Sequence, residues 1–168
     1  PFLARIGSDW EENNLKISNE HFATECLVGF FSEKWRQTNI RKKGVKVLVT
    51  TLPGEPYNLG ALMCAVVTSI TDSKVIYLGI DTPIEEIVTI SKTYKPKIIA
   101  LSISHAMGIN FSEDCLFKLR NDINNETLII TGGKGSPCNI RGVSNILDFN
   151  NYYNFLIKFK ALVSKDKF

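Results

Sequence analysis

From Val45 onward, the chain alternates between short apolar runs and segments with helical spacing. Strands buried on both faces of a parallel sheet are almost continuously apolar, and helices connect one such strand to the next. The alternation therefore predicts an α/β fold: a flavodoxin-like (Rossmann-like) five-stranded parallel sheet with flanking helices and strand order 2-1-3-4-5. The predicted strands cover residues 45–51, 74–78, 97–104 and 127–131, with a short fifth strand at 145–147.

The segments that follow the apolar runs carry helical signals. Thr82 followed by Pro83 indicates a helix start, with a capping residue and then a proline in the first helical position. The predicted helices cover residues 59–70, 82–94, 112–121 and 152–163. In the first of these helices, the spacing predicts one apolar face made of Leu59, Leu62, Met63, Val66, Val67 and Ile70.

Residues 1–40 form a separate helical segment, which we expect to be an incomplete cap on an α/β domain at 45–168. Ser18 is the expected N-cap of its main helix, with Glu20 in the first turn. The apolar stripe behind it must pack on the second region or on a helix outside this chain. The stripe comprises Phe22, Ala23, Cys26, Leu27, Phe30 and Phe31. Because the chain starts at Pro1, we expect it to be a fragment of a longer protein.

Composition excludes several classes of protein. Of the 168 residues 44% are hydrophobic, enough for a core, and the net charge of +3 is too small to indicate nucleic-acid binding. Four cysteines without a C-x-x-C pair argue against a zinc site, and they suggest a reducing, cytoplasmic location. No apolar run is long enough to cross a bilayer, so no membrane association is expected.

Three loops follow strands one, three and four of the predicted sheet, and each contains polar residues or glycine. They are Pro53–Gly60, His105–Phe111 and Thr131–Gly135. The carboxyl ends of parallel strands meet at one edge, where ligands bind in such sheets. Glycine there lets a ligand approach the backbone closely, although a glycine turn alone is an equally good account of these loops.

The combination of loops is more specific than any one of them. The first loop reads Glu55-x-Tyr57-x-Leu59-Gly60. It resembles the acid-x-His-x-x-Gly loop of the cobalamin-binding (B12-binding) domain family. The resemblance implies that this loop borders cobalamin, and that the serines after strand three and the Gly-Gly pair after strand four line a slot for the nucleotide tail of the cofactor. The residues at those positions are Ser102, Ser104, Gly132 and Gly133.

In that family the loop histidine is the lower ligand of the corrin cobalt, but here Tyr57 holds its position. A tyrosine must lose a proton with a pKa of about 10 to become a good ligand, whereas neutral imidazole is ready to bind. The first expectation is base-on binding, in which cobalamin keeps its own benzimidazole as lower ligand. Two alternatives stay open: another ligand such as His105, which we expect to lie too far along the sheet, or loss of cobalamin.

The N-terminal segment carries a second match. Nine residues separate Trp10 from the pair Glu20-His21, a spacing that resembles the helical cap of MerR-type cobalamin-dependent photoreceptor regulators. The resemblance implies that Trp10 covers the adenosyl group, that Glu20 bonds to it, and that His21 binds cobalt once the upper ligand has left. The plainer alternative is that Trp10 anchors a helix start and that the pair occupies a solvated first turn.

These matches predict a non-catalytic sensory or regulatory module that binds adenosylcobalamin and responds to it or to light. Its partners would be cobalamin, a second copy of the chain, and DNA through a domain absent from this chain. One alternative is a corrinoid carrier for methyl transfer. Another is a diverged domain that has lost cobalamin and binds heme or a bilin.

Overall fold

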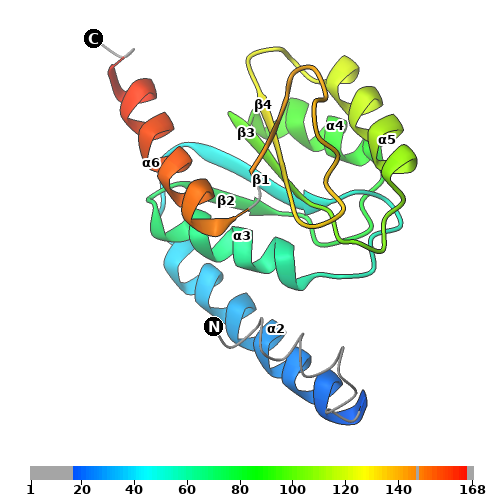
Figure 1. The fold of residues 1–168 in the computed structure, drawn as a ribbon. Coiled ribbons are helices and arrows are strands. Elements are labelled where there is room, and N and C mark those ends of the chain that lie inside the picture. The colour runs from blue at the N-terminus through cyan, green and yellow to red at the C-terminus, as the bar shows by residue number, and fades with distance from the viewer. Residues whose placement is uncertain (1–16, 147, 166–168) are drawn as a thin grey trace.

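A computed structural model describes residues 17–146 and 148–165 of the chain. Its centre is a five-stranded, all-parallel sheet in the order β2-β1-β3-β4-β5, which confirms the predicted topology (Figure 1). The strands are β1 (Lys46–Thr51), β2 (Lys74–Tyr77), β3 (Ile98–Ser102), β4 (Leu128–Gly132) and β5 (Val143–Asn145). The fifth strand begins two residues earlier than the sequence pattern predicts.

The register aligns the carboxyl ends of the central strands. Thr51 at the end of β1 pairs with Ser102 at the end of β3, and Ser102 pairs in turn with Gly132 at the end of β4. The chain leaves the sheet at these three neighbouring positions. The three loops singled out above therefore start side by side.

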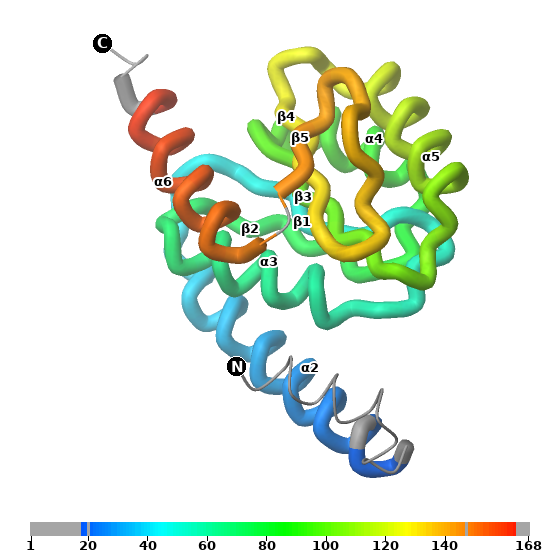
Figure 2. Tube along the Cα trace, in the orientation of Figure 1, coloured from blue at the N-terminus to red at the C-terminus, as the bar shows by residue number. Residues whose placement is uncertain are grey.

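Helices cover both faces of the sheet. They are α2 (Ile17–Asn39), α3 (Leu59–Ile70), α4 (Ile84–Tyr94), α5 (Ile109–Asp122) and α6 (Phe149–Lys165). Helices α3 and α6 lie against one face and α4 and α5 against the other, while α2 runs outside α3 (Figures 1 and 2). No helix in the described ranges is long and apolar enough to span a membrane.

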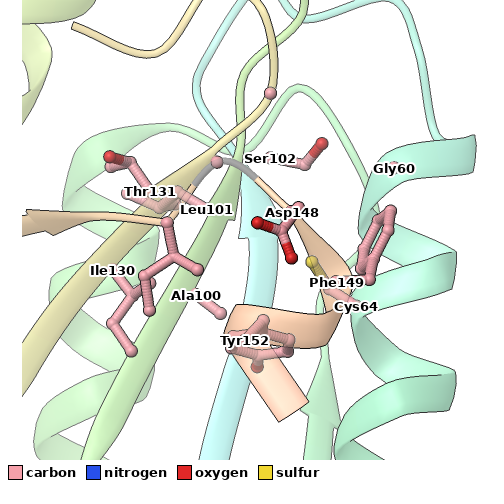
Figure 3. A pocket seen from close by; sticks show the side chains of 13 residues that line it. Gly60, Cys64, Ala100, Leu101, Ser102, Ile130, Thr131, Asp148, Phe149 and Tyr152 are labelled. Carbon is pink, nitrogen blue, oxygen red and sulfur yellow. The ribbon is translucent and has the colours of Figure 1, made fainter. Parts of the chain in front are cut away.

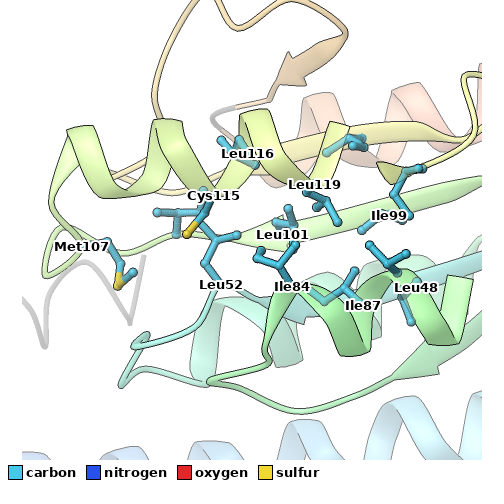
Figure 4. Packing of buried hydrophobic residues seen from close by; sticks show 14 residues of the cluster. Leu48, Leu52, Ile84, Ile87, Ile99, Leu101, Met107, Cys115, Leu116 and Leu119 are labelled. Atoms are coloured by element: carbon cyan, nitrogen blue, oxygen red, sulfur yellow. The ribbon is translucent and has the colours of Figure 1, made fainter. Parts of the chain in front are cut away.

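Alternate residues of each central strand point to opposite cores. Leu48 and Ile99 face a layer built from α4 and α5, which contribute Ile87 and Leu116 among others (Figure 4). Their neighbours on the other face pack against α3 and α6, in a second cluster that includes Val49, Tyr152 and Leu156. Burial on both faces explains why the strands are nearly continuous apolar runs.

Of the predicted face of α3, only Leu62 is fully buried. The residues buried in this helix are Ala61, Leu62, Ala65, Thr68 and Ser69, whereas Ile70 is 56% exposed. The helix is apolar almost all round because α2 covers its outer side, so periodicity does not single out one face. Small side chains face the sheet, and they allow the helix to lie close to it.

Two predicted helix starts are also corrected. Helix α2 already includes Ile17, so Ser18 lies within the helix rather than at its N-cap. Helix α4 begins at Ile84, and Pro83 is the N-cap with an extended ψ of 143°. The Thr82 hydroxyl is instead within 2.7 Å of the Thr50 hydroxyl, which ties the loop to β1.

The C-terminal end of α2 is fixed to the edge of the sheet. The Asn39 side chain donates to the Val75 carbonyl oxygen (3.0 Å) and accepts from the Val75 N–H (2.9 Å). Trp35 packs on Tyr77 with ring centroids 5.5 Å apart. Part of the apolar stripe of α2 is covered by α3, but Phe22 is 72% exposed and Cys26 is exposed rather than buried as expected.

Candidate functional site

An apolar cavity of about 180 Å³ lies between the carboxyl ends of β3 and β4 and the helices α3 and α6 (Figure 3). The sheet, both helices and the segment that follows β5 all contribute to its walls. The lining residues are Gly60, Cys64, Ala100, Leu101, Ser102, Ile130, Thr131, Gly132, Gly133, Ile146, Asp148, Phe149 and Tyr152. We call this cavity the slot.

Two glycines stand at the mouth of the slot. A Cβ added at Gly60 would lie 2.3 Å from the Ser102 hydroxyl oxygen, so a side chain there would force the Ser102 side chain to move. Gly133 has a φ of +106°, and a Cβ there would meet the carbonyl oxygen of Ile103 at 2.2 Å. Both positions therefore keep backbone, rather than side chain, beside the opening.

The sequence-predicted site residues divide into two groups. Gly60, Ser102, Gly132 and Gly133 line the slot, as the resemblance implies. The other predicted residues of the loops after β1 and β3 do not line the slot. They are Glu55, Tyr57, Leu59 and Ser104. Glu55, Tyr57 and Ser104 instead belong to a second cluster outside the slot, described below, and Leu59 is the half-buried first residue of α3.

Among the slot residues that sequence reasoning missed are those from α3 and from the start of α6: Cys64, Asp148, Phe149 and Tyr152. A signal for Cys64 existed, because a residue four positions after Gly60 faces the same side of a helix. Phe149 and Tyr152 are three apart in α6 and also share a face. What the sequence did not indicate is that α6 folds back beside α3, which is a tertiary arrangement.

The ionisable side chains that α3 and α6 bring to the deep end of the slot stay protonated. Burial raises the pKa of the Cys64 thiol to about 12. Burial also raises the pKa of the Tyr152 hydroxyl, which lies 2.8 Å from the Thr68 hydroxyl. Both groups are uncharged near neutral pH, so this part of the slot suits an uncharged, flat or apolar guest.

A buried carboxylate joins the loops that follow β1 and β3. Glu55 is 1% exposed. Its Oε1 accepts a hydrogen bond from the Tyr57 N–H (3.1 Å), and its Oε2 accepts one from the Ser104 N–H (2.7 Å). One side chain thus fixes the backbone of both loops at the same edge of the sheet.

This bridge brings Tyr57 and His105 together. Their rings are stacked, with centroids 6.1 Å apart and planes inclined by 21°. Tyr57 is 53% exposed and His105 is exposed as well, so the pair forms a surface platform above the loops. His105 therefore lies beside Tyr57 and not far along the sheet from it, because Glu55 joins the two loops.

The predicted residues of the cap are only partly described. Trp10 lies outside the described residues, and the side chain of Glu20 is not described either. His21 is an exposed residue in the N-terminal part of α2, the part that extends beyond the sheet and its helices (Figure 2). Over 17–146 and 148–165, no group of three or more histidine, cysteine or acidic side chains is placed to hold a metal ion.

The comparison that decides the family covers four of the five strands and these loops. Residues 45–139 match the family model described as the B12 binding domain. The chain belongs to the B12-binding domain family. The match includes Glu55, Tyr57, Gly60 and the glycines after β4, and it leaves α2 outside. No curated protein sequence matches the chain.

Solved structures share the fold of this B12-binding domain at low sequence identity. A novel cobalamin-binding protein from Desulfitobacterium hafniense has a TM-score of 0.60 and 18% identity, over 92% of this chain and 76% of its own. The monomethylamine corrinoid protein of Methanosarcina barkeri has a TM-score of 0.68 and 13% identity, over 91% of this chain and 76% of its own. The methanol:cobalamin methyltransferase complex of the same organism has a TM-score of 0.58 and 14% identity, over 92% of this chain and 61% of its own.

Proposed function

We propose that the chain binds a corrinoid, with the nucleotide tail of the cofactor in the slot and the corrin ring over the Tyr57–His105 platform. The observation that carries this proposal is the slot itself. It is apolar, its deep end holds neutral side chains, and its mouth is kept open by glycines where a Cβ would collide with its neighbours. A benzimidazole is flat and uncharged, so these walls fit it.

In this proposal the protein residues bind and orient the cofactor and perform no catalysis themselves. The Ser102 hydroxyl at the mouth of the slot is placed to hydrogen-bond the polar part of the tail, and Phe149 and Tyr152 offer aromatic surface to its ring. When bound, the corrinoid supplies a cobalt–carbon bond that light or a methyl acceptor can break. Neither Cys64 nor Tyr152 is activated as a nucleophile or a base, because burial keeps both protonated.

The finer proposal is a sensory or regulatory module that binds adenosylcobalamin and acts through a larger regulator. Its support is the Trp10 and Glu20-His21 spacing, which lies in and before a helix that packs on α3 beside the slot. Loss of the adenosyl group would change what the cap contacts, and so change the position of α2. A second copy of the chain and a DNA-binding domain are the partners through which that change would act.

A corrinoid carrier for methyl transfer is the second candidate. The likeness to the monomethylamine corrinoid protein and to the methanol:cobalamin methyltransferase complex favours it, although at 13% and 14% identity the likeness concerns the fold alone. Tyr57 in place of the loop histidine favours the sensory module, because that histidine helps to tune a cobalt that cycles through low oxidation states.

One experiment separates the two candidates. The protein is incubated with adenosylcobalamin in the dark, its absorption spectrum and oligomeric state are recorded, and both are recorded again after illumination. The sensory proposal predicts tight binding in the dark, and a spectral change with a change of oligomeric state in the light. Binding of methylcobalamin, with methyl transfer to an added thiol-dependent methyltransferase and no change of oligomeric state in the light, would support the carrier instead.

A further inference from the structure

The slot and the first expectation for the lower ligand are in conflict. In base-on cobalamin the benzimidazole is bound to cobalt, so the same ring cannot also fill the slot. If the tail enters the slot, as proposed above, the lower face of the cobalt is left without its own base. A ligand must then come from the protein or from solvent, and the phenol of Tyr57 is a less ready ligand for a transition metal than an imidazole is.

His105 lies beside the residue that holds the family's ligand position. The chain has two histidines, and the other, His21, is in α2. His105 follows β3 by three residues and stacks on Tyr57, the residue at the family's ligand position. Neutral imidazole is a ready ligand for a transition metal.

The loop holds His105 in a defined place. The Met107 N–H donates to the Ser104 carbonyl oxygen (3.2 Å), and the Ala106 N–H donates to the Ser104 hydroxyl (3.2 Å), so residues 104–107 form a tight turn. Glu55 anchors the start of that turn through the Ser104 N–H. The imidazole is therefore exposed for binding while its backbone is fixed, which limits the entropy lost when it binds.

We propose that His105 is the lower axial ligand of the corrinoid cobalt in this protein, in place of the loop histidine that Tyr57 has replaced. This inference rests on the proposed corrinoid binding. The exchange breaks the bond from cobalt to the benzimidazole nitrogen and forms a bond from cobalt to an imidazole nitrogen of His105. The second ring nitrogen keeps its proton, and no electron is transferred. Tyr57 is a positioning residue that keeps the imidazole flat beside it.

Electron paramagnetic resonance of the cobalt(II) form of bound cobalamin tests the ligand directly. An axial nitrogen splits the cobalt lines into triplets when it is the common isotope and into doublets when it is the heavy isotope. The protein is prepared with histidine labelled with heavy nitrogen and loaded with unlabelled cobalamin. The inference predicts doublets for the natural sequence and for His21→Ala, and loss of the doublets in His105→Ala. Both histidines are exposed, so both variants are expected to fold.

The outcomes distinguish this inference from the proposed function. Triplets in the labelled protein would mean that the benzimidazole stays on cobalt, which would overturn the role of His105 while cobalamin binding stood. Cobalt lines without any splitting by an axial nitrogen would also overturn the role of His105. So would doublets that are lost in His21→Ala but kept in His105→Ala. If no cobalamin remained with the protein after gel filtration, the proposed function itself would fail.

Discussion

Replacing Glu55 with alanine is expected to lower the free energy of unfolding by about 2–4 kcal/mol, the cost of losing two charge-assisted hydrogen bonds at a buried site. The carboxylate is 1% exposed and accepts from the N–H groups of Tyr57 and Ser104. Without it, both N–H groups lose their partner and a side-chain-sized void remains. The loops after β1 and β3 would then no longer be held together.

Urea unfolding followed by circular dichroism measures this effect. Glu85→Ala is the matched control, because the Glu85 carboxylate is on the surface and only forms an exposed ion pair with Lys118. Its removal should leave the unfolding midpoint nearly unchanged. Glu55→Gln keeps one acceptor oxygen, so its unfolding midpoint should fall between those of the natural protein and Glu55→Ala. Equal midpoints for Glu55→Ala and Glu85→Ala would contradict the bridging role of Glu55.

Replacing Gly60 with valine is expected to weaken cobalamin binding about 100-fold, a loss of about 3 kcal/mol of binding free energy, because the new side chain blocks the entrance of the slot. Even the Cβ of the new side chain would lie 2.3 Å from the Ser102 hydroxyl oxygen, and the methyl groups would occupy the mouth of the slot. The Ser102 side chain can rotate away, so the fold should survive while the tail loses its entrance.

Gly29→Val controls for the change of residue type. Gly29 also lies within a helix, α2, but nothing lies within 4 Å of a Cβ added there. Equilibrium dialysis against cobalamin should give the natural affinity for Gly29→Val and a large loss for Gly60→Val. If the two variants bound equally well, the slot would not be the place where the cofactor tail enters.

The sheet could be predicted from the sequence because its physical cause is local. Burial on both faces makes a strand such as residues 98–102 apolar throughout, and the order of the strands then follows from the connecting helices. The glycines of the slot were also predictable, because glycine after a parallel strand signals close approach of the backbone. These are properties that a single segment carries in its own residues.

What the sequence did not predict depends on contacts between distant segments. The loops of Tyr57 and His105 were predicted to share one edge of the sheet, but the hydrogen bonds of Glu55 that join them and the stacking of the two rings were not. The walls that Cys64 and Tyr152 give to the slot depend on α6 lying beside α3. The buried face of α3 could not be singled out because both of its sides are covered.

The most direct test of corrinoid binding through the slot compares two ligands that differ only in the nucleotide tail. Cobalamin carries the tail, whereas cobinamide has the same corrin ring without it. Isothermal titration of both, in the dark and in the same buffer, measures what the tail contributes to the affinity. We predict that cobalamin binds at least about 100-fold more tightly, since burying a flat apolar ring of this size contributes about 3 kcal/mol. Equal affinities for the two ligands, or no binding of cobalamin, would contradict the account.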